Sequence, residues 1–315
     1  MIYQKQPLGL RNSIVKEIIY DDYALITVFT PTYNRKHTLA RTYESLCSQT
    51  NKSFIWLIID DGSTDNTIEL VNQWQQAKNG FEIRYIYKTN GGMHTAHNVA
   101  YENIDTELNM CVDSDDMIPP NAIQIIYSTW NSVRDVKYAG LIGLDADLKN
   151  HIIGPEFPFT GYETTLFDYE KKYGNEDKKL VYRTDVMRRY PPYPEFKNEK
   201  LVPLSYKYLL CDQDYLLYSV NEIFCNVEYQ PDGSTNNIWK QRANNAKGFA
   251  FYKRIRMRYS SSFKMLIKDT IHYIASSIIG NNKSIIKNSP RKVLTISLFP
   301  MGIVYAMIIK IKANR

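Results

Sequence analysis

Two short segments of the sequence concentrate carboxylates, Asp60-Asp61-Gly-Ser-Thr-Asp65 and Asp113-Ser-Asp-Asp116. Like charges at this density repel one another unless a cation or hydrogen-bond donors neutralise them. Neither segment contains Cys or His, so the cation that suits them is a hard one, Mg²⁺ or Mn²⁺. Such ions usually take one or two carboxylates and complete their coordination with substrate phosphates. The two segments therefore predict a site for a phosphorylated ligand.

Other phosphate and metal motifs are missing from the sequence. It contains no G-x-x-x-x-G-K-[ST] segment, which excludes a P-loop. Gly91 and Gly92 do not belong to a G-x-G-x-x-G fingerprint, which excludes a dinucleotide site of that type. The four cysteines lie far apart without a C-x-x-C pair, so we expect neither a zinc ribbon nor a disulfide framework.

The acidic segments follow apolar runs that are typical of buried strands. We expect strands over residues 23–30, 54–59, 83–87 and 108–112, each followed by a segment with helical spacing. This alternation predicts an α/β fold with a doubly wound, mainly parallel sheet flanked by helices. Ligands of such sheets bind beyond the carboxyl ends of the strands, so the polar clusters should meet in one crevice. Farther along, we expect a strand over 141–144, a helix over 203–218 and a strand over 223–229.

Four segments, in this order, resemble the motifs of the family 2 glycosyltransferases, which have the GT-A fold. Pro31-Thr-Tyr-Asn-Arg35 is similar to the family's P-x-Y-N segment, and Asp60-Asp61-Gly-Ser-Thr-Asp65 to its D-D-G-S-x-D motif. Asn90-Gly-Gly-Met-His-Thr-Ala-His-Asn98 resembles its N-x-G-x-x-x-A-R-N segment, with His97 in place of the usual Arg. Asp113-Ser-Asp-Asp116 resembles its D-x-D-D metal site.

The resemblance implies which residues bind a nucleotide-sugar donor, usually a UDP-sugar. Asp61 would accept a hydrogen bond from the uracil ring N–H, and Asp60 would support the loop. Asp115 would be the main ligand of Mn²⁺ or Mg²⁺, while Asp113 would contact the ribose and is a second candidate ligand. The other donor-binding residues implied in this way are Pro31, Tyr33, Arg35, Asn90, Gly92 and Ser114. We expect no direct role for His94 or His97.

The resemblance also implies an inverting single displacement, in which a carboxylate takes the proton of the acceptor hydroxyl. Glu199 is the candidate base, 84 residues after Asp115. Its segment, Phe196-Lys-Asn-Glu-Lys-Leu-Val-Pro203, resembles the F-x-G-E-K-F-x-P variant of capsule and cell-surface polysaccharide members. Lys200 stands where the family usually has Asp. Asp212 and Asp214 remain alternative candidates.

The C-terminal part of the chain differs in charge from the rest. The whole chain carries +6, yet residues 250–315 contain thirteen Lys or Arg and a single acid, Asp269. Apolar residues between 263 and 278 recur at helical spacing, and residues 293–309 carry no charge. Basic residues beside an amphipathic stripe are typical of segments that bind an anionic membrane surface. We therefore expect a helical, membrane-associating tail rather than a nucleic-acid-binding one.

These patterns divide the chain into a nucleotide-sugar-binding half (1–125), an acceptor-binding half (126–248) and the tail (249–315). With the resemblance they predict an inverting, metal-dependent glycosyltransferase that extends a lipid-linked saccharide in bacterial surface polysaccharide synthesis. We expect it at the cytoplasmic face of the membrane, bound peripherally or monotopically. Two alternatives stay open, a sugar-nucleotide nucleotidyltransferase and a catalytically silent membrane-bound subunit of a polysaccharide assembly machine. The sequence does not specify the donor sugar, the acceptor or the oligomeric state.

Overall fold

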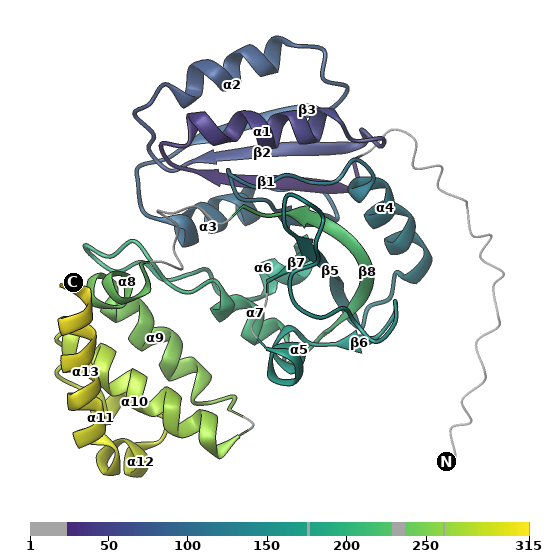
Figure 1. The fold of residues 1–315 in the computed structure, drawn as a ribbon. Coiled ribbons are helices and arrows are strands. Elements are labelled where there is room, and N and C mark those ends of the chain that lie inside the picture. The colour runs from purple at the N-terminus through teal and green to yellow at the C-terminus, as the bar shows by residue number, and fades with distance from the viewer. Residues whose placement is uncertain (1–23, 175–176, 229–236, 261, 315) are drawn as a thin grey trace, which may run out of the picture.

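The computed structural model describes residues 24–174, 177–228, 237–260 and 262–314. Within them, one eight-stranded sheet is flanked by helices, and a group of C-terminal helices lies beside it (Figure 1). The strand order is β3-β2-β1-β4-β7-β5-β8-β6. The α/β class with helices on both faces is thereby confirmed.

The first four strands are parallel neighbours, as expected. They are β1 (Ile26–Thr32), β2 (Phe54–Asp60), β3 (Glu82–Tyr87) and β4 (Leu108–Cys111). Strand β1 runs two residues beyond its expected end and includes Pro31, which pairs with Ile59. The proline is tolerated because its nitrogen faces the side of β4, which pairs with β1 only as far as Phe29.

The second half makes the sheet mixed. Strand β7 (Lys178–Arg183) runs antiparallel between β4 and β5 (Tyr138–Ala146), and it lies in the stretch where the sequence shows weak periodicity. Strand β8 (Leu216–Asn226) pairs with β5, and β6 (Glu163–Thr164) closes that edge. The helix expected over 203–218 is wrong in its second part, since α7 ends at Cys211. A turn after it, in which Tyr215 N–H donates to the Cys211 carbonyl, leads directly into β8.

Apolar side chains bury both faces of the sheet in two separate clusters. Helices α1 (Lys36–Cys47), α2 (Thr67–Gln76) and α4 (Ala122–Val133) supply one cluster, which includes Leu39, Trp74 and Trp130. The other face is covered by α3 (Met93–Asn103), α5 (Leu166–Tyr173), α6 (Thr184–Arg189) and α7 (Ser205–Cys211). Burial on both faces explains why β1 and β2 are buried along their whole length and why β2 is almost entirely apolar.

The C-terminal helices form a small module of their own. They are α8 (Ile238–Asn244), α9 (Ala246–Arg256), α10 (Phe263–Ile279), α11 (Ile285–Asn288), α12 (Lys292–Ser297) and α13 (Phe299–Ala313). Helix α10 packs between α9 and α13 (Figure 1). The apolar run 293–309 is divided between α12 and α13, with Pro300 in the first turn of α13. Among the described residues, no helix has the length and apolar character that a membrane crossing requires.

Candidate active site

A cavity of about 690 Å³ opens at the carboxyl ends of β1 and β4. Pro31 and Arg35 line it from the end of β1, and residues Asp113 to Asp116 line it from the loop after β4. Residues from the second half of the chain, among them Asp145 and Lys179, form the opposite wall. The structure thus brings together two of the predicted polar segments, at the end of the sheet where they were expected.

In the acidic loop after β4, the pKa values of two carboxylates are raised, so neighbouring cations do not fully offset the burial of their negative charge. Burial, and then repulsion from Asp113, raise the pKa of Asp115. Burial raises the pKa of Asp116 to about 7, although Lys179 lies 3.6 Å from its carboxylate. A hard divalent cation held by Asp115 and Asp113 would favour the ionised carboxylates, so the residues present fit such an ion. Within the described ranges, no three His, Cys, Asp or Glu side chains are grouped as a metal site on their own.

Lys179 is a cavity residue that sequence reasoning missed. It projects from β7 toward Asp116 and Asp145. Burial alone would lower its pKa, but the surrounding Cys225 and acidic side chains raise it well above the usual value, so the ammonium stays charged. Burial also raises the pKa of Asp145 to about 6, and Oδ1 of this carboxylate is buried without a hydrogen-bond partner. A lysine near the start of a strand that was not predicted gave no signal in the sequence.

The Asp60–Asp61 segment has a supporting role in the structure. Asp60 accepts hydrogen bonds from Ser63 N–H at 2.7 Å and from the Tyr85 hydroxyl at 2.6 Å, which fixes the loop as expected. Asp61 does not line the cavity. Its carboxylate accepts from the backbone N–H of Gly91 and Gly92 at 2.9 and 2.7 Å, and from Lys88. Three donors therefore bond the carboxylate that was predicted to accept from the uracil N–H, and that role stays a prediction.

The Asn90–Gly92 turn is held against β2 by the same contacts. Asn90 donates its side-chain N–H to the carbonyl of Asp61 at 2.7 Å. Gly92 has φ +95°, and a Cβ there would lie 1.8 Å from the carbonyl oxygen of Lys200. Neither residue lines the cavity, and neither does the exposed Tyr33, whereas Ser114 is buried in the cavity wall. Of the predicted donor residues, Pro31, Arg35, Asp113, Ser114 and Asp115 lie at the cavity.

His97 is buried in the cavity wall. Its ring packs edge-on against Phe29 at 4.9 Å, and its Nδ1 lies 3.4 Å from the Tyr101 hydroxyl. Burial lowers the pKa of His97 to about 3, so the imidazole is neutral at physiological pH. It cannot supply the positive charge of an arginine at this position.

Glu199, the predicted base, lies at the start of a C-terminal helix, and its role as the base stays a prediction. Its carboxylate accepts the backbone N–H groups of Lys247 and Gly248, both at 2.9 Å, and so caps the first turn of α9. A helix N-terminus attracts a carboxylate through its free N–H groups and its dipole. Glu199 does not line the cavity.

The two alternative bases lie elsewhere as well. Asp212 accepts from Phe167 N–H at 2.9 Å in the first turn of α5, and burial raises its pKa to about 7. Asp214 is exposed and accepts from the Tyr190 hydroxyl at 2.8 Å. Neither lines the cavity.

Glu170 on α5 is a further carboxylate at the cavity. Beyond the acidic loop, the described carboxylates at the cavity are Asp145, Glu170, Asp177 and Glu228. Asp145 faces Lys179, Asp177 is exposed, and Glu228 forms an ion pair with Arg41 at 2.6 Å. Glu170 is half-buried, and burial raises its pKa above the usual value. The weak periodicity of its segment concealed it in the sequence.

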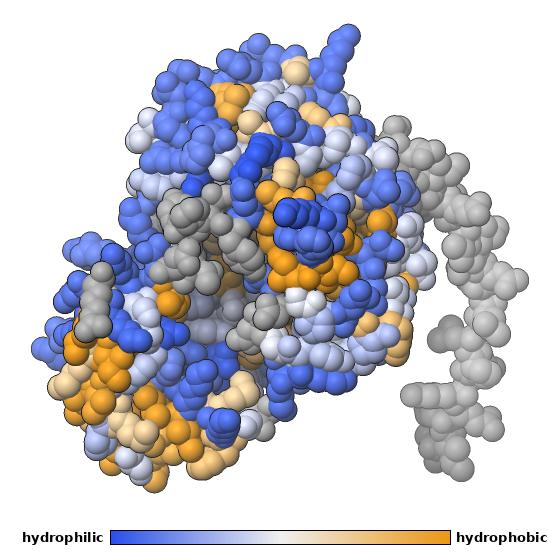
Figure 2. Space-filling view, in the orientation of Figure 1, coloured by the Kyte–Doolittle hydropathy of each residue, from blue (hydrophilic) through white to orange (hydrophobic). Residues whose placement is uncertain are grey.

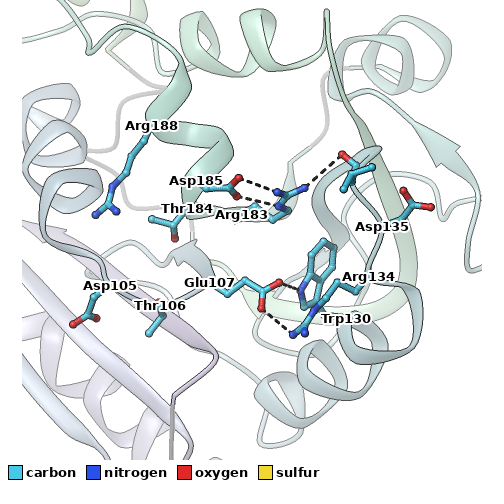
Figure 3. A pocket seen from close by; sticks show the side chains of 11 residues that line it. Asp105, Thr106, Glu107, Trp130, Arg134, Asp135, Arg183, Thr184, Asp185 and Arg188 are labelled. Carbon is cyan, nitrogen blue, oxygen red and sulfur yellow. Dashed lines mark hydrogen bonds and ion pairs between the residues drawn. The ribbon is translucent and has the colours of Figure 1, made fainter. Parts of the chain in front are cut away.

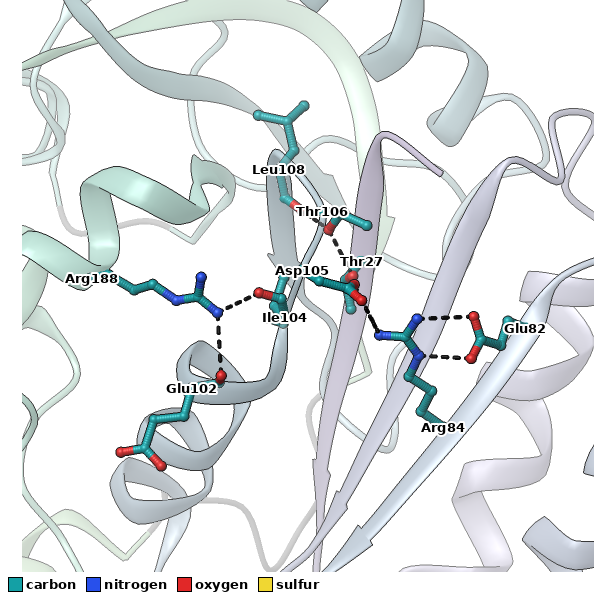
Figure 4. Close-up of polar contacts among 9 residues, drawn as sticks. All are labelled: Thr27, Glu82, Arg84, Glu102, Ile104, Asp105, Thr106, Leu108 and Arg188. Atoms are coloured by element: carbon teal, nitrogen blue, oxygen red, sulfur yellow. Dashed lines mark hydrogen bonds and ion pairs between the residues drawn. The ribbon is translucent and has the colours of Figure 1, made fainter. Parts of the chain in front are cut away.

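A second cavity, of about 650 Å³, lies at the amino end of β4 (Figure 3). Its charged side chains already have partners, because Arg134 pairs with Glu107 and Arg183 with Asp185, both at 2.8 Å. Arg188 donates to the backbone carbonyls that end α3 (Figure 4). Arg84 of β3 pairs with Glu82 of the same strand and with Asp105 of the loop before β4, and so joins that loop to β3 (Figure 4). These contacts indicate that this cavity is structural.

Comparison with known proteins identifies similar sequences. The family model "Glycosyl transferase family 2" matches residues 27–189. An uncharacterized glycosyltransferase of Rickettsia felis is 36% identical over 121 residues, 38% of this chain and 19% of that protein. Glycosyltransferase GlyA of Streptococcus pneumoniae is 31% identical over 168 residues, 52% of this chain and 23% of that protein. The chain thus spans about a fifth of the length of these relatives.

Solved structures share the fold over most of the chain. Residues 1–349 of TarS from S. aureus, in complex with UDP-GlcNAc, give a TM-score of 0.58 at 16% identity, over 90% of this chain and 91% of that one. The mannosyltransferase PcManGT from Pyrobaculum calidifontis, in complex with GDP-Man and Mn²⁺, gives 0.54 at 12% identity, over 90% and 87%. Both show that the architecture is of the GT-A type.

Proposed function

We propose that this chain, which belongs to glycosyl transferase family 2 and is a glycosyltransferase, transfers a sugar from a UDP-sugar to a hydroxyl group. The hydroxyl group belongs to a lipid-linked saccharide, and the transfer inverts the anomeric carbon. The observation that carries the proposal is the cavity where Pro31, Arg35 and the Asp113–Asp116 loop meet. The shared fold with structures that hold UDP-GlcNAc and GDP-Man supports a nucleotide-sugar as the donor.

In this proposal, the first half of the cavity binds the donor. Arg35 and Pro31 border the nucleotide, and Asp115, with Asp113, holds Mn²⁺ or Mg²⁺. The metal would supply positive charge that offsets the charge on the leaving nucleoside diphosphate. Asp61 acts indirectly, because it anchors the Gly91–Gly92 turn rather than contacting the base.

The second half of the cavity handles the acceptor. The hydroxyl oxygen of the acceptor forms the new bond to the anomeric carbon as the bond to the diphosphate breaks, and its proton moves to a carboxylate. We assign that carboxylate to Glu170 in place of Glu199. A half-buried carboxylate with a raised pKa is a stronger base than an exposed one, and such proton transfer contributes about 10²–10⁴-fold in rate.

The proposed acceptor determines where in the cell we expect the enzyme to act. A lipid-linked saccharide keeps the enzyme at the cytoplasmic face of a bacterial membrane, where it would act in capsule or other surface polysaccharide synthesis. The exposed apolar side chains of the C-terminal helices support a membrane-bound rather than a freely diffusing enzyme.

The experiment that tests the proposal measures binding and hydrolysis of a panel of UDP-, GDP- and dTDP-sugars by the full chain, with and without Mn²⁺. One donor that binds tightly only with metal and is slowly hydrolysed supports it. Donor binding without hydrolysis or transfer would instead favour a silent subunit. Pyrophosphate release from a nucleoside triphosphate and a sugar phosphate would favour a nucleotidyltransferase.

A further inference from the structure

Helices α12 and α13 expose an unusual number of large apolar side chains. Figure 2 shows hydrophobic residues gathered over this C-terminal module. We call the following set the outer face: Val293, Ile296, Met301, Val304, Met307 and Ile311, all exposed. On α13 they recur at positions 301, 304, 307 and 311, which share one side of a helix. Monomeric soluble proteins rarely expose so many apolar residues together, and such patches mark interaction sites.

The opposite side of α13 is already used for packing, so the outer face has no role in the core of the module. Gly302, Ala306 and Ile309 are buried. A Cβ on Gly302 would lie 2.3 Å from Cγ2 of Ile274, which shows how closely α13 approaches α10. Small residues make this contact, while the large apolar ones point away from it. A helix that is apolar on both sides needs a second apolar partner.

The charges around the outer face are of one sign. Arg291 and Lys292 precede Val293, and Lys310 and Lys312 flank Ile311, all four exposed. Asp269, the only acid between residues 250 and 315, is buried elsewhere and bonds Lys253 and Arg256. Basic residues at both ends of an apolar face complement a surface that is apolar inside and negative outside.

We propose that the outer face is the membrane-docking surface of this protein, and that its partner is a bilayer containing anionic lipid. The helices lie in the plane of the interface, with the outer face in the acyl region and the four basic side chains at the headgroups. A second copy of the chain fits less well, because a symmetric contact would bring the same cations together. This proposal deepens the proposed function by naming the surface that brings the enzyme to its lipid-linked acceptor.

The structure narrows the surface that the sequence indicated. The tail was expected to bind through residues 250–312, including the basic run before α10 and the apolar stripe along α10. Lys253 and Arg256 are turned toward Asp269, and Ile274 belongs to the core of the module. The docking surface therefore comprises α12, α13 and their flanking residues.

The test compares two charge-introducing variants of the full chain. Val304→Asp lies on the outer face, and Val136→Asp is the matched control on the sheet domain, since the wild-type side chains are 57% and 81% exposed. Each variant is mixed with vesicles of phosphatidylethanolamine and phosphatidylglycerol, or of phosphatidylcholine alone, and flotation is measured. Val304→Asp should lower partitioning onto the anionic vesicles by about tenfold or more, while Val136→Asp should bind like wild type.

Two further measurements make the outcome decisive. Lys310→Glu should weaken binding at low salt and have little effect at high salt, because headgroup attraction is screened. Hydrolysis of the donor sugar in solution should be the same in all variants, so loss of docking is separable from loss of the transferase activity. Wild type that does not float, or Val304→Asp that floats like the control, would overturn the proposal. A wild-type dimer in sedimentation that Val304→Asp dissociates, without vesicle binding, would assign the face to a second copy.

Discussion

Asp269→Asn should destabilise the C-terminal helices strongly, although it preserves the size of the side chain. The Asp269 carboxylate lies between α9 and α10 and is 3% exposed. One oxygen accepts from Lys253 Nζ at 2.8 Å and the other from Arg256 Nε at 2.9 Å. An asparagine can accept from one of them only, and its NH₂ group then faces the other cation. Breaking a buried ion pair in this way costs about 3–5 kcal/mol, because a charge is left without compensation.

The matched control is Asp185→Asn. Asp185 also bonds two cations, Arg183 and Arg189, but its side chain is 49% exposed. Water replaces the lost contacts there, so we expect a change of no more than about 1 kcal/mol.

Urea denaturation followed by circular dichroism measures the free energy of unfolding of each variant, and hydrogen exchange localises the loss. Faster exchange should be confined to α9, α10 and α13 in Asp269→Asn. The triple variant Lys253→Met, Arg256→Met, Asp269→Leu should recover most of the loss, because an apolar replacement leaves no unpaired charge. If Asp269→Asn and Asp185→Asn differ by less than about 1 kcal/mol, the buried pair does not hold the helices together.

Four further predictions concern the cavity and its surroundings. Asp115→Ala should abolish transfer without lowering the melting temperature, and retained activity would remove Asp115 from the metal site. Glu170→Gln should lower kcat by about 10²–10⁴-fold with donor binding intact, and an unchanged kcat would exclude it as the base. Glu199→Gln should leave kcat within a few-fold and cost about 1 kcal/mol of stability, as expected for a helix cap; a large loss of kcat would restore it as the base. His97 has a pKa of about 3 in the folded state against about 6.5 when unfolded, so the unfolded chain binds more protons between those values. Stability should therefore be full above pH 6.5 and fall by up to about 1.4 kcal/mol per pH unit toward pH 3, and His97→Asn should reduce that slope in acid denaturation.

The fold of the first half of the chain could be predicted from the sequence because its signals are local. Strand β2 is a continuous apolar run up to Asp60, and each polar cluster stands at or just after the carboxyl end of a strand. Because the strands are parallel, their carboxyl ends lie at the same edge of the sheet, which brings Pro31 and Arg35 close to the Asp113–Asp116 loop. The contacts of Asp61 did not follow, because they depend on backbone N–H groups that the Gly91–Gly92 turn directs toward it.

The second half of the chain was harder to predict because its signals come from tertiary contacts. Strand β7 begins with Lys178 and Lys179, and two charged residues in a row do not predict a buried strand unless their partners are known. Lys178 donates to the carbonyl of Ile153, and Lys179 lies among the cavity acids. Glu199 has the spacing of a base, yet the helix that it caps forms 47 residues later, at Ala246. No local pattern reports such a contact.

In the C-terminal module, one buried acid, Asp269, pairs with two of the basic side chains. By composition, the thirteen Lys and Arg of residues 250–315 are equivalent, and they predict an anionic partner for the whole segment. In the structure, Lys253 and Arg256 of α9 bond Asp269 of α10, which joins the two helices. The cations beside α12 and α13 are exposed, namely Arg291, Lys292, Lys310 and Lys312. The buried pair and the docking surface are therefore linked through α10, which contacts both. Loss of Asp269 should weaken membrane binding indirectly, through detachment of α13, whereas Val304→Asp should weaken it with the module still folded.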